Sequence, residues 1–397
     1  MPQASAELIA PNAYKVGNFD KGTTKGVVSR QWISRPDDEK HLSLGGLLGK
    51  VRARRERSIE RRIDTRKIEF FAPVPTSRAD MHDLSLGLPG GDIISPSHYS
   101  FGQLAGLAKA PAGYLRTLPS QIVSDALTYG MRYNRENETV KLYSADESLL
   151  AATGPDYGRI YDEEVVEAVM QIAGNGTGDT RWKAPGVLDW RTMIYDPDAP
   201  ITLDSTTFYA SDRDVFIFLV DDRNPIEVGK LPDGSPDLMF RGFIVTNSEV
   251  GNGALKIMAF YLRAVCMNRN LWGVEGFEEI SMRHSKYAPS RFIEEARPAL
   301  ASFAEGSSRK LIEGVQKAKA AKVADNDEDA ISFLAARKFS KSQISAVMEA
   351  VETEEGRPAR TVWDMAQGIT AHARTIPHTD TRVAFEIEAR KLLDKVA

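Results

Sequence analysis

The clearest pattern of hydrophobic and polar positions lies between Phe240 and Trp272. Two runs rich in β-branched and aromatic residues, 243–246 and 257–265, flank the turn-forming sequence NSEVGNG at 247–253. This arrangement predicts a β-hairpin. Its second strand carries apolar side chains on both faces, as strands do inside a sheet that is covered on both sides. Ile257 and Phe260 are therefore expected in the core.

The rest of the middle region alternates strand and helix patterns. Strands are predicted at 68–74, 139–143, 182–183, 187–195, 206–210 and 215–220. An amphipathic helix is predicted at 161–172, with three acidic residues in its first turn. We expect a mostly antiparallel sheet with helices packed on it.

Two short helices are predicted to begin near Ser100 and Pro111, joined by a tight turn. Their spacing is loosely similar to a helix-turn-helix. Lys109 stands where that turn normally has glycine, and only Arg116 and Thr117 could read bases. An ordinary αα-hairpin is therefore favoured.

Strand patterns end at Pro289, and the remainder is predicted to be helical. The six helices expected are 291–304, 308–324, 328–337, 340–352, 361–373 and 382–396. Pro298 should kink the first helix or end it early. The whole pattern predicts an α+β fold in three parts: an extended arm and basic helix (1–63), an α+β core domain (64–288) and a C-terminal helical domain (289–397).

Composition narrows the class of protein. The chain has 397 residues and 42% hydrophobic residues, enough for a sizeable core. No apolar run approaches the ~20 residues that span a bilayer, and the N-terminus has no signal-peptide pattern. We expect a cytoplasmic protein without a membrane partner. Because Cys266 is the single cysteine, an internal disulfide is excluded. We expect it to be a small buried thiol.

Charge is distributed unevenly along the chain. The net charge of −4 does not indicate a nucleic-acid partner. One helix is predicted over 42–62, apolar at its start and basic at its end. Its candidate phosphate contacts are Arg52, Arg54, Arg55, Arg57, Arg61 and Arg62. A solvated helix face and a phosphate-binding face both fit these arginines.

Motifs of the common enzyme classes are absent from the sequence. It has no phosphate-binding loop, nucleophile elbow or His-Glu-x-x-His motif, and no two of its six histidines are four residues apart on a helix. We predict no catalytic residue, cofactor or metal ligand. A series of aspartates could hold Mg²⁺, although most lie where aspartate forms turns: Asp189, Asp196, Asp198, Asp204, Asp212, Asp214, Asp221 and Asp222.

Four stretches of sequence resemble one known family. They are TNSEVGNGALKI with the Arg-x-Val-Cys-x-Asn that follows it, SFGQLAGLAKAPAGYLRTLP, GPDYGRIYDEEVVEAV and TVWDMAQGITAHA. Together they resemble the phage/plasmid-like proteins of the domain-of-unknown-function family nine-thirty-two, from about Leu42 to the C-terminus. The chain departs from the family at Arg269, where a small hydroxyl residue is usual. The resemblance implies a bacterial host cell and no particular activity.

The remaining candidates for chemistry are cations and aromatic residues. Lys256, Arg263 and Arg269 follow the predicted hairpin, and its aromatic residues could either stack on bases or fill the core. We predict a non-enzymatic DNA-binding protein of replication or recombination that favours single strands and forms homo-oligomers. In outline its topology is similar to that of phage single-strand annealing proteins. The alternatives are a phage interaction or assembly protein and a metal-dependent nuclease.

Overall fold

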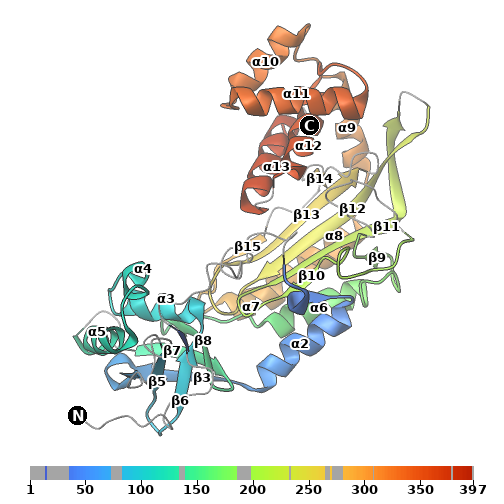
Figure 1. The fold of residues 1–397 in the computed structure, drawn as a ribbon. Coiled ribbons are helices and arrows are strands. Elements are labelled where there is room, and N and C mark those ends of the chain that lie inside the picture. Colours follow the sequence, from blue (N-terminus) through green and yellow to red (C-terminus); the bar gives the residue numbers. More distant parts are fainter. Residues whose placement is uncertain are drawn as a thin grey trace.

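The computed structural model contains two β-sheets and a bundle of helices, which follow one another along an elongated molecule (Figure 1). The structure describes residues 14–15, 35–72, 83–133, 139–185, 198–231, 234–263, 269–270, 280–306, 308–376 and 379–395. The α+β class predicted from sequence is confirmed. The predicted strand at 187–195 lies outside the described residues.

The larger sheet has eight strands, and the predicted hairpin lies at its centre. Its order is β14 (Arg269–Asn270), β13 (Leu255–Arg263), β12 (Pro236–Asn247), β11 (Val215–Lys230), β10 (Phe208–Ala210) and β2 (Lys40–His41), with β15 (Ile280–Met282) on β13 and β9 (Trp182–Lys183) on β11. All these pairings are antiparallel. Strand β11 continues ten residues beyond the predicted end, past a register shift after Asp221.

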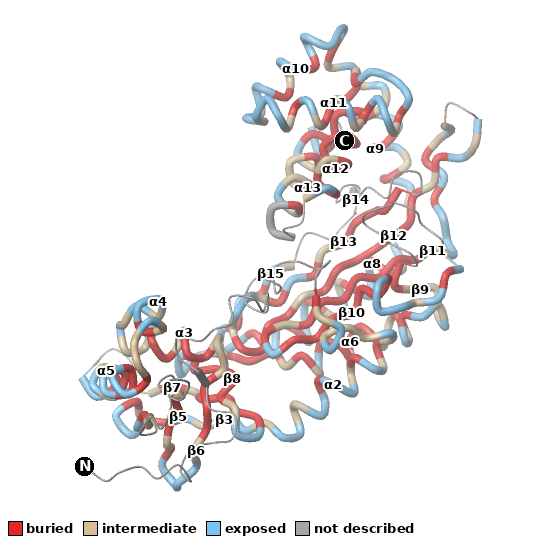
Figure 2. Tube along the Cα trace, in the orientation of Figure 1, coloured by how far each residue is buried: buried red, intermediate tan, exposed pale blue. Residues whose placement is uncertain are grey.

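Both faces of this sheet are buried, as the hairpin pattern predicted. One face is covered by α2 (Leu44–Glu56), α6 (Asp162–Ala173), α7 (Ala288–Arg291), the π-helical turn η6 (Phe292–Ala296) and α8 (Arg297–Glu305). Ile257 points to that side and is 1% exposed, whereas Phe260 lies in an aromatic cluster on the opposite face and is 0% exposed. Figure 2 shows this burial along the central strands.

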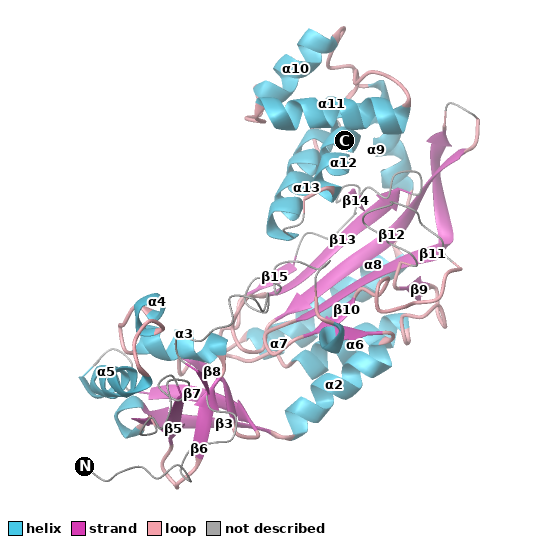
Figure 3. Cartoon of the chain, viewed as in Figure 1, coloured by secondary structure: helices cyan, strands magenta, loops and turns pink. Residues whose placement is uncertain are grey.

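The smaller sheet has seven strands and its own core. Its order is β1 (Tyr14–Lys15), β5 (Asp83–Gly87), β6 (Ile93–Pro96), β8 (Ser148–Thr153), β7 (Thr139–Ala145) and β3 (Ser58–Asp64), with β4 (Glu69–Phe71) on β5. Only β6 and β8 are parallel among these described pairs. Helices α3 (His98–Leu107), α4 (Ala112–Leu115) and α5 (Ser120–Tyr133) pack against it (Figure 3).

The prediction of one helix over 42–62 is wrong. Helix α2 ends at Glu56, and Ser58–Asp64 forms β3. The short 3-10 turn η3 (Asp37–Glu39) precedes β2, and a second one, η4 (Thr65–Lys67), follows β3. Strand β3 pairs along its whole length with β7, so tertiary pairing overrides the helical propensity of its charged residues. Arg61 and Arg62 therefore lie on a strand.

The C-terminal helices form a third core. They are α9 (Arg309–Ala320), α10 (Asp327–Ala335), α11 (Lys341–Glu355), α12 (Val362–Arg374) and α13 (Thr379–Leu393). Their apolar faces pack around Trp363 and onto the far end of the hairpin through Met239 and Tyr261. Residues 288–305 instead pack on the larger sheet, and the π-helical turn there lies directly before Pro298, as expected for a helix disturbed by proline. The three-part division of the chain stays a prediction.

Candidate functional site

Three of the four motif stretches meet at the turn between β12 and β13. Gln103 of α3 donates from Nε2 to the Val250 carbonyl (2.9 Å) and accepts from the Ala152 backbone N–H (2.8 Å). Tyr157 donates its hydroxyl to the Ser248 carbonyl at 3.3 Å. We call this convergence, built around residues 247–252, the turn junction. It joins the two sheets.

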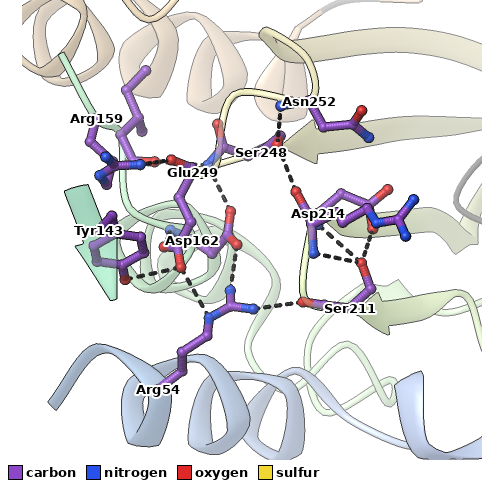
Figure 4. Close-up of polar contacts among 12 residues, drawn as sticks. Arg54, Tyr143, Arg159, Asp162, Ser211, Asp214, Ser248, Glu249 and Asn252 are labelled. Carbon is purple, nitrogen blue, oxygen red and sulfur yellow. Dashed lines mark hydrogen bonds and ion pairs between the residues drawn. The ribbon is translucent and has the colours of Figure 1, made fainter. Parts of the chain in front are cut away.

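Glu249 is the centre of the turn junction and is 2% exposed. Its carboxylate accepts from the Tyr143 hydroxyl (3.1 Å) and from the Asp162 backbone N–H (3.0 Å), and it pairs with Arg54 Nε at 3.0 Å. The Asp162 N–H belongs to the first turn of α6, where backbone donors lack helical partners and favour an anion. Glu249 therefore occupies the anion site at this helix N-terminus (Figure 4).

A second buried carboxylate, Asp162, shares Arg54 with Glu249. Arg54 Nη2 contacts Asp162 Oδ2 at 2.6 Å, and Asn247 donates from Nδ2 to Asp162 Oδ1 at 2.7 Å. Burial raises the pKa of Asp162 well above its ordinary value, and the neighbouring Glu249 carboxylate raises it further. The cluster thus holds two carboxylates against one guanidinium, with the Arg159 side chain over the Tyr143 ring beside it.

The same turn is attached to the β10–β11 connection. Ser248 donates from Oγ to the Arg213 carbonyl at 2.6 Å. The next residue of that connection, Asp214, accepts two hydrogen bonds from Arg35, of 2.7 and 2.8 Å. Ser248 also accepts from the backbone N–H groups of Asn252 and Gly251, through Oγ and the carbonyl respectively. The backbone N–H groups of Gly251 and Asn252 therefore both donate within the turn. This arrangement stabilises the fold.

His284 lies beside the turn junction and is 8% exposed. Its ring stacks on Tyr157 with centroids 5.1 Å apart, and Nδ1 accepts from the Ile160 backbone N–H at 3.2 Å. Burial, with a smaller contribution from Arg159, lowers the pKa of His284 to about 4. The ring is therefore neutral at physiological pH.

The arginines of residues 50–67, which we call the basic segment, mostly contact acidic groups. Arg52 pairs with Glu163 and Glu167, Arg57 with Asp146, Arg61 with Asp92, Arg66 with Asp64, and Arg54 with the two buried carboxylates. Arg55 lies over the Tyr161 ring, 3.9 Å from its centre, and Arg62 donates to the Pro155 carbonyl. Much of the positive charge of this segment is neutralised by its surroundings.

The hairpin cations have different environments. Arg263 is 2% exposed, with Nε 2.7 Å from Asp237 and Nη1 in contact with Glu355. It anchors the helical bundle to the sheet, so its guanidinium is not at the surface, where the predicted contact with nucleic acid requires it. Lys256 is exposed, and the side chain of Arg269 lies outside the described residues, as do Cys266 and Trp272. Phe260 and Tyr261 are core residues.

The aspartates of the series that lie in the described ranges do not gather into a metal site. Asp214 pairs with Arg35, and Asp221 accepts from Asn224, while Asp189 and Asp196 fall outside the described residues. Among the residues described, no group of three or more His, Cys, Asp or Glu side chains could hold a metal ion. No helix in the described ranges is long and apolar enough to cross a bilayer.

These features define an α+β protein in which three of the four motif stretches build an internal contact between the two sheets. Residues 187–382 match the model of a family described as a domain of unknown function, DUF932. The matched range includes the hairpin and the TVWDMAQGITAHA stretch, and the two earlier stretches lie before it. No curated protein and no solved structure matches the chain.

Sequence reasoning missed Glu249, Asp162 and Arg159 as members of the turn junction. Arg159 and Asp162 lie in one stretch, but Glu249 follows them by more than eighty residues, so no local spacing connects it to them. The available signal was a glutamate inside NSEVGNG, between two apolar strands, where an ionised group requires partners if the turn is buried.

Proposed function

We propose that the protein binds single-stranded DNA without cutting it. The observation that supports this is a group of exposed cations beside an exposed aromatic ring at the edge of the larger sheet. It consists of Lys256 on β13, Arg283 and Lys286 after β15, and Tyr287, which is 62% exposed. We call these four residues the β15 patch.

Strand pairing brings Lys256 and Arg283 together. Lys256 lies opposite Ser281 on β15, so Arg283, two residues further, projects from the same face as Lys256. The Lys286 ammonium lies 4.8 Å from the centre of the Tyr287 ring. None of the three cations forms an ion pair with a residue in the described part of the chain, in contrast to most arginines of the basic segment.

This chemistry suits a single strand better than a duplex. Cations attract the phosphate backbone regardless of sequence, and an exposed tyrosine can stack on a base only where that base is unstacked from its neighbours. The patch has no helix or ribbon shaped to enter a major groove. A role in replication or recombination, including strand annealing, extends this proposal and rests only on the outline similarity to single-strand annealing proteins.

The test is salt-dependent binding of a labelled oligothymidine, followed by fluorescence anisotropy. Replacing Lys256, Arg283 and Lys286 by alanine should weaken binding and reduce the slope of log affinity against log salt by about two, because each lost phosphate contact contributes roughly 0.7 on single strands.

The matched control replaces Arg52, Arg57 and Arg309 by alanine. These are exposed but ion-paired, with Arg309 contacting Glu313, and their loss changes the net charge equally. The control should bind with nearly the original affinity and slope. Equal losses in the two triple variants, or a wild-type protein that does not bind the oligonucleotide, would contradict the proposal.

A further inference from the structure

Helix α5 presents an apolar stripe to solvent in addition to its buried face. Ile122, Tyr129 and Tyr133 are 53%, 66% and 68% exposed, and half-buried Ala126 lies between them. The four residues are spaced by four, three and four positions, so they form one line along the helix. The rings of Tyr129 and Tyr133 are 4.6 Å apart. This is the spacing of residues at a helix–helix contact.

The helix that carries this stripe is held firmly by its own domain. Val123, Leu127 and Met131 are fully buried on its other side. Gly130 approaches α3 so closely that a Cβ there would lie 2.7 Å from the Ala108 carbonyl oxygen. The stripe is therefore a fixed surface, and exposed contiguous apolar side chains of this kind mark interaction sites.

Charges beside the stripe select the partner. Asp125 and Arg132 are both exposed and lie seven residues apart on the same flank, where Arg132 also lies 3.5 Å from Glu69 of its own chain. If a second copy of α5 packs antiparallel about a two-fold axis, that flank meets itself, and Asp125 of one copy lies beside Arg132 of the other. The contact occurs twice, as two-fold symmetry requires.

A parallel arrangement lacks this complementarity. The acidic and basic flank would then face the opposite flank of the second helix, which contains Val123 and Gly130 and is turned toward its own domain. Flanking charges of this kind determine orientation and partner in helix pairs.

We propose that α5 is a self-association surface through which two copies of this chain form an antiparallel helix pair. Tyr129 packs across the two-fold axis near Ala126 of the second copy, and Tyr133 packs near Ile122. One helix pair buries less than the roughly 1,200 Å² of a standard stable interface, so the dimer dissociates on dilution.

Charge exchange tests the arrangement directly, with mass measured by sedimentation over a wide range of protein concentration. Wild type should shift from monomer to dimer as concentration rises. Asp125→Arg places arginines together and Arg132→Asp places aspartates together, so each single variant should remain monomeric at concentrations where wild type dimerises. The double variant restores both pairs and should dimerise again. Because all these positions are exposed, the fold should persist, which circular dichroism checks.

In the charge-exchange experiment, the proposal is overturned by a wild type that is monomeric throughout, by single variants that dimerise like wild type, or by a charge-exchanged double variant that stays monomeric. The Tyr129→Ala, Tyr133→Ala double variant separates a protein partner from a nucleic acid. Loss of the dimer is expected. Loss of oligothymidine binding with an unchanged dimer would assign the tyrosines to bases and overturn the proposal.

Discussion

The basic segment and the β15 patch are both cationic, but their surroundings differ. In the basic segment, the guanidinium groups of Arg52, Arg57 and Arg61 each contact a carboxylate from another part of the chain. In the patch, Lys256 and Arg283 are exposed without an ion pair to any described residue. A dense run of positive residues therefore shows where charge lies along the sequence. Binding of an anionic partner depends instead on the charge that the folded protein leaves unneutralised.

The largest effect should come from Arg54, the arginine of the basic segment whose two carboxylate partners are buried. Arg54→Met leaves the Asp162 and Glu249 carboxylates buried without their cation, so we expect a loss of about 3–5 kcal/mol in the free energy of unfolding. Arg52→Ala, at an exposed pair in the same helix, should cost about 1 kcal/mol or less. Urea denaturation of both variants measures the difference. If the two variants lost similar amounts of unfolding free energy, burial of the carboxylates at the turn junction would not be what makes Arg54 important for stability.

A comparable contrast exists within strand β13. Phe260→Ala removes a fully buried ring and should cost about 3–5 kcal/mol of unfolding free energy. Lys256→Ala, four residues earlier on the same face, should change stability by less than about 0.5 kcal/mol while weakening DNA binding. Denaturant melts and anisotropy titrations give the two readouts. A Phe260→Ala protein as stable as wild type would contradict the two-faced burial of the strand.

His284, next to Arg283, should make stability depend on pH. Its folded pKa of about 4 lies below the ordinary value of 6.5, so the unfolded chain binds the proton first. Stability from this group is complete above about pH 6.5 and is lost as pH falls toward 4, by up to about 3 kcal/mol.

His284→Asn keeps an acceptor near the Ile160 N–H and removes the titration. Unfolding free energies measured at intervals across this range should fall less steeply for the variant. Parallel pH profiles for the two proteins would show that His284 is not responsible.

The smallest effect concerns the aromatic member of the β15 patch. Tyr287→Ala should weaken single-strand binding by about 1–3 kcal/mol, because one stacking surface is lost, while Tyr287→Phe should bind nearly as well as wild type. Anisotropy with the same oligothymidine measures both. If Tyr287→Ala bound the oligothymidine as tightly as wild type, only the cations of the β15 patch would contribute to binding.

Elements with a strong local period could be predicted from sequence. The hairpin, the helix α6 and the C-terminal helices follow alternations of apolar and polar residues within single segments. Strand β3 could not, because Ser58–Asp64 is polar and becomes a strand only by pairing with β7. Strand β8 was also missed, since a short apolar run such as SLLAAT has no period that separates strand from helix.

The sites were harder to predict than the fold because they also depend on residues that are far apart in the sequence. Residue type identified cations, but their availability depends on partners brought from distant segments. Arg263 is buried because Asp237 and Glu355 converge on it, and no spacing in the sequence connects Glu355 to the hairpin. Arg283 was overlooked because it is isolated in the chain and comes near Lys256 only through the pairing of β13 with β15.

The distances along the chain within the turn junction affect the order in which the protein can fold. Tyr143 on β7 and Gln103 on α3 form hydrogen bonds with the turn at 248–250. The ribosome synthesises that turn more than a hundred residues after either of them. Until the ribosome has released that turn, the N-terminus of α6 lacks the carboxylate that occupies it, and Arg54 lacks one of its two anions. The contacts of the turn junction therefore cannot form in the first half of the nascent chain until the hairpin has been synthesised.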